Sequence, residues 1–329
     1  MKDIINIDKK SEVPLTGCIA FGVIDRGTNL IQIRPTTICN LACSFCSTDA
    51  GVCSSYHEVD YIVELNYLLS WIKRVVALKD CKIEINIDSV GEPTTYPSLM
   101  SLIENLRKIP GVYKISMQTN GTLLNKKVIS QLESVGLNRL NLSIHSGDEE
   151  IAKRLAGCNT YDVNKIINVA RVLAETKINL ALAPVWIPSI NDKEMPKLIA
   201  LAKELNCDIC IQKYETYRYS RKINGAKEIN YWKFYKQLKA WEKELDKKLV
   251  FRSGDLNIVK AQRLPEVFKK GEKTLVELKF KGWVKGEAIA IARDRCITII
   301  NYKNKIIPGD KIKVKIIETK NNIYLAEII

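Results

Sequence analysis

Three closely spaced cysteines are the residues of this chain best placed to do chemistry. Cys39, Cys43 and Cys46 follow the pattern C-x-x-x-C-x-x-C. Three thiolates so close in sequence can converge on one soft metal centre, and cysteine thiolates hold iron-sulfur clusters. A four-iron cluster carried by three cysteines leaves one iron free. The spacing therefore indicates a site that chelates a small molecule as well as passing electrons.

A purely structural role for these cysteines is the alternative interpretation, because free cysteine is among the most buried residue types. The surrounding sequence weighs against it. The cysteines follow an apolar, β-branched run at residues 30–33 and share their segment with the loop formers Pro35, Thr36 and Asn40. We therefore expect them on a loop at the end of a strand.

The cysteine spacing, together with Phe45 before the last cysteine, resembles the signature of the radical S-adenosylmethionine (radical SAM) superfamily. The resemblance implies a [4Fe-4S] cluster on Cys39, Cys43 and Cys46, with Phe45 beside the adenine of S-adenosylmethionine. It also implies reductive cleavage of the cofactor to a 5'-deoxyadenosyl radical, chemistry that the cofactor carries and the protein orients. A reductant such as ferredoxin or flavodoxin is an implied partner.

Strands and helices are expected to alternate through the first 210 residues. The expected strands cover residues 29–35, 82–88, 113–118, 139–144, 179–185 and 208–213. The expected helices cover residues 60–78, 97–108, 125–135, 149–155, 163–175 and 193–205. This alternation indicates an α/β fold of parallel βα units, whose active sites collect at the C-terminal ends of the strands. Six units match the partial (β/α)6 barrel that the resemblance implies.

Further candidate cofactor residues follow three of these strands. The segment from Ser89 to Pro93 resembles the family's Gly-Gly-Glu motif, which engages the methionine amino group, with Val90 in place of the first glycine. The resemblance extends to polar residues at the next two strand ends, which hold the carboxylate and ribose. It therefore implies cofactor contacts at Gly91, Glu92, Thr119, Asn120 and Ser143. A Gly-Glu-Pro turn, an Asn-Gly turn and a buried strand serine are the alternatives.

Two residues are candidates for a direct role in the reaction. His145 stands at a strand end beside Ser143, and a structural histidine is an equal alternative. Cys158 could act as a catalytic thiol, although a buried loop thiol is the plainer interpretation. His57, the second of the two histidines, is interpreted as structural. The pair Cys207 and Cys210 falls on an expected strand, where positions three apart point to opposite faces.

The basic charge of the chain is confined to its last third. Residues 1–210 hold 23 Lys and Arg against 23 Asp and Glu, whereas residues 211–329 hold 28 against 14. A neutral body with a basic appendage favours a polyanionic partner, and nucleic acid is the leading candidate. A lysine-rich solvated surface is the alternative, but it does not explain why the excess falls on one side of a boundary.

The C-terminal third is expected to change architecture. Residues 229–247 have the period of a helix, and five short strands follow at residues 274–280, 286–292, 296–300, 311–317 and 323–328. Five strands broken by glycines and by the turn at Pro308 indicate a small closed antiparallel barrel. This tail resembles a TRAM domain, an OB-like barrel found on RNA-modifying enzymes.

We therefore divide the chain into an N-terminal extension (1–28), a radical SAM core (29–228), a helical linker region (229–270) and a TRAM-like barrel (271–329). The charged start of the chain and the lack of a long apolar run predict no signal peptide and no membrane span. Ten cysteines without a disulfide framework are typical of a cytoplasmic protein.

The leading functional hypothesis is radical SAM modification of RNA, with tRNA as the expected RNA and the basic tail as its binding site. Modification of a protein or small metabolite is the alternative enzyme reading. A non-catalytic iron-sulfur RNA-binding protein is the alternative from another class. The sequence does not contain the extra N-terminal cluster domain of the methylthiotransferases that share this domain pairing, so the group installed stays open.

Overall fold

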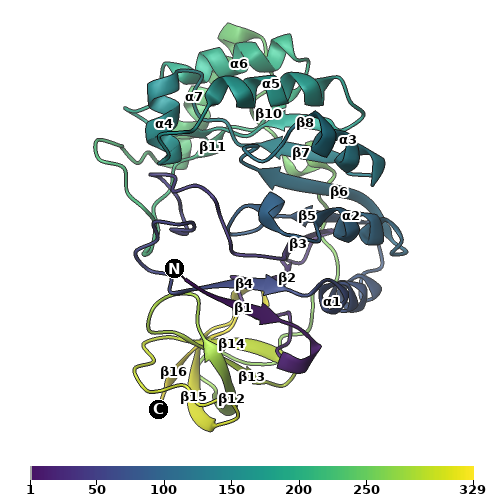
Figure 1. Cartoon of the computed structure of the whole chain (residues 1–329), viewed down its shortest axis with the longest axis vertical. Helices are drawn as coiled ribbons and strands as arrows, with labels where there is room; N and C mark the ends of the chain where they lie inside the picture. Colours follow the sequence, from purple (N-terminus) through teal and green to yellow (C-terminus); the bar gives the residue numbers. More distant parts are fainter. Residues whose placement is uncertain (1) are drawn as a thin grey trace.

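The computed structural model describes residues 2–329, which form a curved sheet with helices on one side and a small β-barrel at one end (Figure 1). The sheet has seven strands in the order β10-β8-β7-β6-β5-β3-β2. Six of these strands are parallel, and β2 pairs with β3 in the antiparallel sense at the edge. The predicted (β/α)6 alternation is confirmed, with one strand added at its edge.

Most strands and helices of this core agree with the predicted ranges to within a few residues. The strands are β2 (Gly22–Asp25), β3 (Leu30–Arg34), β5 (Ile83–Ile87), β6 (Val112–Thr119), β7 (Arg139–Leu142), β8 (Asn179–Leu182) and β10 (Asp208–Ile209). The helices are α1 (Leu65–Ala77), α2 (Leu99–Arg107), α3 (Lys126–Ser134), α4 (Glu149–Ala156), α5 (Val163–Ala174) and α6 (Glu194–Glu204).

Helix α5 shows how the sequence specifies these elements. Its N-terminus is capped by Asp162, whose carboxylate accepts a hydrogen bond from the backbone N–H of Lys165. Ile166, Val169 and Leu173 recur at helical spacing and are buried against the sheet. Local capping and an apolar stripe therefore fix both the start of the helix and the face that it turns to the core.

The predicted helix at residues 60–78 begins five residues too early. Residues Val59–Val63 form strand β4, which pairs in parallel with β1 (Asp3–Ile7) outside the main sheet. The helix begins after Glu64, whose carboxylate accepts two backbone N–H groups of the first turn at 2.8 and 2.7 Å. The helix begins at this cap, and not at residue 60, because the Glu64 carboxylate satisfies N–H groups that the first turn cannot pair internally.

The last two predicted strands of the core are each broken into short pieces. Strand β8 ends at Leu182, and β9 (Val185–Trp186) pairs with β11 (Gln212–Lys213) as a separate ladder. Pro184 separates β8 from β9, and proline cannot donate to a sheet ladder. The hydrogen-bonded ladder of the main sheet is therefore interrupted between β8 and β9.

Helix α7 (Tyr231–Leu245) follows the core and matches the predicted helix at 229–247. Its buried stripe consists of Phe234, Leu238 and Trp241. In residues 2–329, none of the helices combines the length and apolarity needed to span a bilayer.

The chain after α7 runs back along the sheet as an extended segment. The backbone of Val259 exchanges hydrogen bonds with Asn29, at 3.0 and 2.9 Å. The N–H of Leu264 donates to the buried carboxylate of Asp25, which also forms an ion pair of 2.8 Å with Lys79. The linker is therefore fixed to the core and is not a free tether.

The C-terminal strands close into a barrel in the order β12-β13-β14-β16-β15. They are β12 (Lys273–Lys281), β13 (Ala288–Ala292), β14 (Arg295–Ile299), β15 (Lys311–Glu318) and β16 (Leu325–Ile328). The five predicted strands and the closure are confirmed, but the purely antiparallel arrangement is wrong because β14 and β16 are parallel. An odd number of strands in a closed ring cannot alternate in direction throughout.

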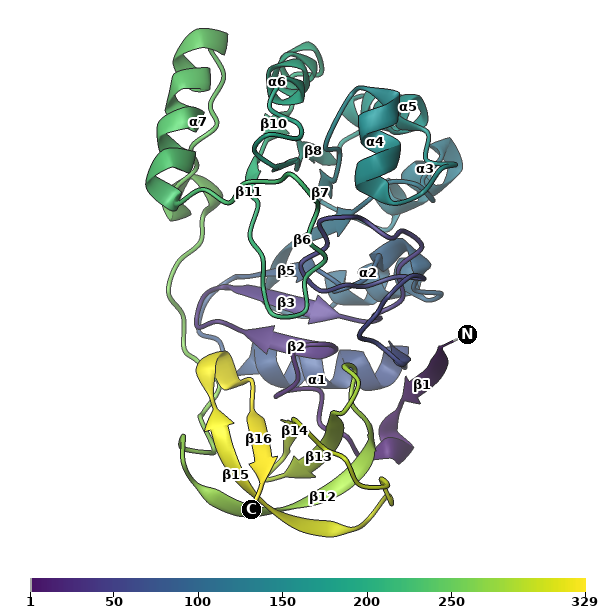
Figure 2. The ribbon, with the colours of Figure 1, turned by 90° about the vertical axis from the view of Figure 1, so that its left-hand side faces the viewer.

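The barrel packs directly on the core through the N-terminal residues (Figure 2). The N–H groups of Cys296 and Tyr324 donate to the carbonyls of Thr16 and Gly17, at 2.8 and 3.0 Å. A Cβ on Gly17 would lie 2.1 Å from the carbonyl oxygen of Cys296, so only glycine allows this approach. The predicted extension at 1–28 thus forms part of the joint between sheet and barrel.

Candidate active site

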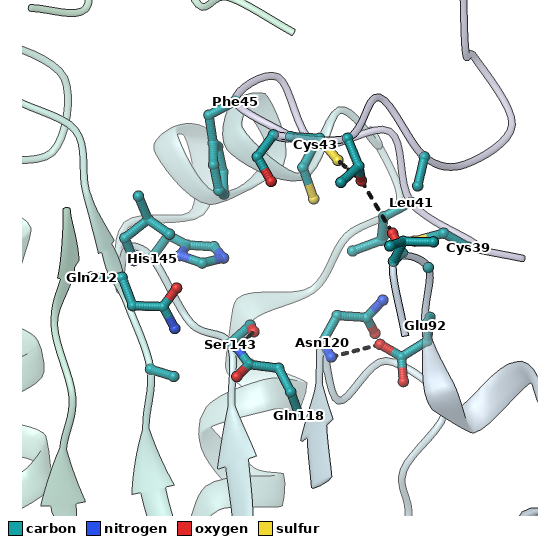
Figure 3. A pocket seen from close by; sticks show the side chains of 18 of the residues that line it. Cys39, Leu41, Cys43, Phe45, Glu92, Gln118, Asn120, Ser143, His145 and Gln212 are labelled. Atoms are coloured by element: carbon teal, nitrogen blue, oxygen red, sulfur yellow. Dashed lines mark hydrogen bonds between the residues drawn. The ribbon is translucent and has the colours of Figure 1, made fainter. Parts of the chain in front are cut away.

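The cysteine loop (residues 38–50) lies over the C-terminal ends of the parallel strands (Figure 3). Together with these strand ends, it encloses a pocket of about 430 Å³. The pocket brings together the predicted cluster ligands and cofactor residues, with His145 beside them. The residues that line it include Cys39, Cys43, Phe45, Cys46, Gly91, Glu92, Thr119, Asn120, Ser143 and His145.

Two glycines hold the cysteine loop by close backbone contact. A Cβ on Gly91 would lie 2.2 Å from the carbonyl oxygen of Ile38, and one on Gly157 would lie 2.0 Å from that of Ala42. Gly157 also has a positive φ of 60° at the end of α4. Glycine is therefore required at both positions, because each packs against a backbone carbonyl of the cysteine loop.

Arg221 contacts the cysteine loop and was not identified from the sequence. Its guanidinium forms an ion pair of 2.6 Å with the buried carboxylate of Asp49 and donates to the carbonyl of Cys43 at 3.3 Å. Its backbone N–H donates to the carbonyl of Cys46 at 2.9 Å. Arg221 thus fixes the cysteine loop from a segment more than 170 residues away, and no local pattern marks it.

The three cysteine thiols are partly buried and free of disulfides. Burial raises the pKa of Cys39 to about 12 and that of Cys43 above its usual range. Both thiols would have to lose a proton in order to bind iron. In residues 2–329, no three metal-binding side chains are gathered closely enough to hold a single ion. Cys39, Cys43 and Cys46 would therefore hold a multi-iron cluster and not a single metal ion.

Glu92 is buried, with 2% of its surface exposed, and its carboxylate is held by four hydrogen bonds. One oxygen accepts from the N–H and hydroxyl of Thr94 and from the hydroxyl of Thr119, at 3.0, 2.6 and 2.6 Å. The other accepts only from the N–H of Asn120, at 2.7 Å (Figure 3). Burial raises the pKa of Glu92, and these donors oppose that rise. The second oxygen therefore keeps a lone pair that no donor within residues 2–329 occupies, and Glu92 lines the pocket.

Thr119 and Asn120 stabilise the walls of the site. The hydroxyl of Thr119 is directed at Glu92, and the side-chain amide of Asn120 donates to Asn40 in the cysteine loop at 3.0 Å. The hydroxyl of Ser143 accepts from the Gln118 amide at 3.1 Å and faces the pocket. Through these contacts the end of β6 positions both Glu92 and the cysteine loop.

His145 contacts Phe45 at the far wall of the pocket. Their ring centroids are 4.7 Å apart in an edge-to-face arrangement. Burial lowers the pKa of His145 to about 4, so the ring is neutral at neutral pH. Its Nδ1 accepts the backbone N–H of Val185 at 3.0 Å, which places the ring proton on Nε2. His145 can therefore donate one hydrogen bond, while its low pKa makes it a poor proton carrier.

Cys158 is not among the residues that line this pocket. It follows Gly157, and its thiol lies 3.3 Å from the hydroxyl of Thr160. Its proposed role as a catalytic thiol stays a prediction.

The other cysteines are scattered over the chain. Cys18 and Cys296 lie together, buried, at the joint between core and barrel. Cys210 lines a smaller cavity inside the sheet, whereas Cys207 is packed in the apolar core. Cys207 and Cys210 therefore lie in different surroundings, which agrees with the expectation that they point to opposite faces.

Charged residues at the pocket mouth were also missed. Arg34, at the end of β3, donates to the carbonyl of Asp88 at 3.1 Å and is 8% exposed. Lys213 and Glu215 also line the pocket. An arginine that ends an apolar strand is the one sequence signal that could have identified Arg34.

Comparisons with known proteins agree with this fold. Residues 33–202 match the family model described as the radical SAM superfamily. An uncharacterized protein of Methanocaldococcus jannaschii is 39% identical, over 96% of this chain and 79% of the relative. The chain belongs to the radical SAM superfamily, whose members bind a [4Fe-4S] cluster and S-adenosylmethionine.

More distant relatives share the core. A GTP 3',8-cyclase of Thermodesulfovibrio yellowstonii is 31% identical over 56% of this chain, and the match spans just over half of the cyclase, 56%. Among solved structures, anSMEcpe with bound AdoMet has a TM-score of 0.53 at 23% identity, over 69% of this chain and 64% of that one. TYW1 has a TM-score of 0.50 at 22% identity, over 70% and 78%. These two structures support the fold alone.

Proposed function

We propose that Cys39, Cys43 and Cys46 hold the [4Fe-4S] cluster and that Glu92 receives the amino group of S-adenosylmethionine. Bound there, the cofactor supplies a 5'-deoxyadenosyl radical. The chain's own residues orient it: Phe45 and His145 form an apolar wall, and Ser143 offers a hydroxyl. The free lone pair on Glu92 supports this assignment, because a buried carboxylate next to an ammonium group makes a strong charge-assisted contact.

We propose that the substrate is RNA, with tRNA as the expected RNA. The observation that carries this proposal is a basic face on the barrel. On paired strands β12 and β15, Lys273 stands directly opposite Lys315, and Leu275 stands opposite Lys313. Like charges directly opposite each other in a sheet are destabilising. A surface that keeps such a pair is suited to a polyanion that neutralises it.

Ion pairing sets these lysines apart from the other basic residues of the barrel. Lys279, Lys281, Lys285 and Arg293 each contact a carboxylate. Within residues 2–329, no carboxylate lies in ion-pair distance of the barrel-face lysines, which are Lys273, Lys311, Lys313 and Lys315. Glu277 stands opposite Lys311 and Glu327 stands opposite Lys315, so these carboxylates offset part of the charge of the face. The four lysines still outnumber the two carboxylates, which leaves a net positive charge available for phosphate.

Substitution of the barrel-face lysines tests the proposal. The variant Lys311→Gln/Lys313→Gln/Lys315→Gln should bind tRNA more weakly and should reduce the log-log salt slope by about 2 to 3, since each phosphate contact adds about 0.7 to 0.9. The matched control is Lys126→Gln/Lys127→Gln/Lys177→Gln, which removes the same charge from exposed positions of the core. Equal tRNA affinity in both variants would contradict the proposal. Substitution is preferable to deletion because the barrel packs on the core.

A second candidate is a small nucleotide substrate. It is favoured by the similarity to GTP 3',8-cyclases, which covers 56% of this chain. Incubation of the reduced, reconstituted protein with S-adenosylmethionine and either GTP or tRNA separates the two. Substrate-dependent release of 5'-deoxyadenosine with GTP alone would favour the nucleotide.

A further inference from the structure

Four exposed aromatic side chains lie on α7 and on the segment that leads to it from the pocket. This aromatic patch consists of Tyr217, Tyr231, Trp232 and Tyr235. Tyr217, Tyr231, Trp232 and Tyr235 are 57%, 53%, 68% and 42% exposed. The buried stripe of α7 uses other residues, so these rings contribute little to the packing of the helix. Large exposed aromatic groups that gather in one place mark interaction sites.

Cations accompany the rings of this patch. Lys213 lies over the ring of Tyr231 at 5.0 Å from its centroid, and Lys236 lies over that of Trp232 at 5.0 Å. Residues 213–248 contain eleven Lys and Arg against five Asp and Glu. A basic surface with exposed aromatic faces is the combination that binds single-stranded nucleic acid, because every base has a π-face that can stack.

The patch is continuous with the pocket. Tyr217 and Lys213 line the pocket mouth. Glu215 accepts hydrogen bonds from the hydroxyls of both Tyr217 and Tyr231, at 2.8 and 2.9 Å, and so connects the mouth with the first turn of α7. The segment between β11 and α7 runs across the front of the sheet near the cysteine loop (Figure 2).

We propose that the aromatic patch binds the single-stranded RNA that flanks the modified nucleotide, with bases stacked on Trp232 and Tyr231. This inference rests on the proposed RNA substrate and adds where and in what form the RNA binds. An enzyme that acts on a base must take that base out of its stack, and single-stranded flanks reduce the cost. Proteins recognise single-stranded RNA in the same way, by stacking its unpaired bases on aromatic side chains. The barrel-face lysines would then hold phosphate, while the patch holds bases.

The intrinsic fluorescence of Trp232 provides a probe for this proposal. Trp232 is 68% exposed, whereas the other four tryptophans, Trp71, Trp186, Trp241 and Trp283, are 6 or 7% exposed. Tryptophan emission that acrylamide quenches should therefore come chiefly from Trp232. Titration of the full-length protein with a uridine-rich RNA of about twelve nucleotides, a length within known site sizes, should reduce both this emission and its quenching by acrylamide.

Variants make the test specific. Trp232→Ala should weaken binding of this oligonucleotide roughly 5- to 100-fold, as expected for the loss of one stacked base, and Trp232→Phe should bind with less loss but without the fluorescence change. The control variant is Tyr113→Ala, which removes a 37% exposed aromatic residue at the start of β6, the end of the strand away from the pocket. It should bind the oligonucleotide as tightly as the wild type. A perfect RNA duplex at equal phosphate concentration should leave Trp232 accessible, because its bases are already stacked.

The outcomes separate this inference from the proposed function. If labelled tRNA and the oligonucleotide bind but Trp232 stays equally accessible, and Trp232→Ala binds as tightly as the wild type, the patch proposal is wrong while the RNA proposal stands. If neither RNA binds the intact protein, both are wrong, and the patch is left for a protein partner.

Discussion

His57 stacks on Trp283, with ring centroids 3.7 Å apart and ring planes 12° from parallel. One ring nitrogen of His57 lies 3.0 Å from the carbonyl oxygen of Trp283, and the other lies 2.5 Å from that of Thr48. Thr48 belongs to the cysteine loop and Trp283 to the turn between β12 and β13. A single side chain thus connects the candidate cluster site with the C-terminal barrel, in agreement with its interpretation as structural.

Replacement of His57 by Ala should lower the free energy of unfolding by about 2 to 4 kcal/mol, because it removes a buried stack and the hydrogen bond that the ring N–H donates to a backbone carbonyl. The cysteine loop should also hold iron less tightly. Thermal unfolding and iron content after gel filtration measure the two effects. Tyr56→Phe, at a neighbouring exposed position, is the control. An unchanged melting temperature would mean that other contacts hold the barrel in place.

Single substitutions Cys39→Ala, Cys43→Ala and Cys46→Ala should each abolish a stable [4Fe-4S] chromophore and the formation of 5'-deoxyadenosine, because a cluster with two ligands is exposed to loss. Absorbance, iron content and an anaerobic cleavage assay provide the readouts. Cys53→Ala changes an exposed thiol nearby and should retain the cluster. A triple alanine variant that still bound four irons would refute the ligand assignment.

Glu92→Gln should weaken S-adenosylmethionine binding roughly tenfold while the cluster still assembles, because a neutral amide replaces a charge-assisted contact. The variant should also lose some stability, since both oxygens of Glu92 accept hydrogen bonds and an amide supplies only one acceptor. Isothermal titration calorimetry measures the affinity for S-adenosylmethionine, and thermal unfolding measures the stability separately. Thr119→Val removes one bond to Glu92 without altering the charge and should have the smaller effect on affinity.

Stability should depend on pH through Glu287. Burial raises the pKa of this carboxyl from its ordinary 4.5 to about 7, against the opposing charge of Arg218. The folded state therefore favours the protonated carboxyl. Its contribution is complete below about pH 4.5 and is lost as the pH rises through about 7, a change of up to about 3 kcal/mol.

Glu287→Gln should remove this dependence. The stability of the variant relative to the wild type should increase between about pH 5 and pH 8, because only the wild type must ionise a buried group. Melting temperatures at the two pH values measure it, and the remaining acceptor of Gln can keep the bond from Val284. A constant difference between variant and wild type would show that Glu287 ionises freely in the folded protein.

Much of the fold and site could be predicted because the signals are local. The cysteine spacing lies within eight residues, and Thr119, Asn120 and Ser143 follow strands whose ends must meet at one edge of a parallel sheet. Helix caps such as Asp162 stand next to the helices that they begin.

The remainder depends on contacts between distant segments. Arg221 and Asp49 are 172 positions apart, and neither has a neighbour that predicts the pairing. The strand at Val59–Val63 exists because β1 pairs with it, and an apolar run of that length fits a helix equally well. The exposed rings of α7 became informative only when their position beside the pocket was known.

The attachment of the linker to Asp25 and Asn29 has a geometric consequence. Because residues 257–264 are bonded to the core and the barrel packs on it, the fold sets the distance between the barrel-face lysines and the pocket. For an RNA substrate, a constant distance fixes how far the nucleotide in the pocket lies from the segment that the barrel binds. The protein would select the nucleotide to be modified by its distance along the folded RNA from the segment held by the barrel, with little need to read the sequence in between.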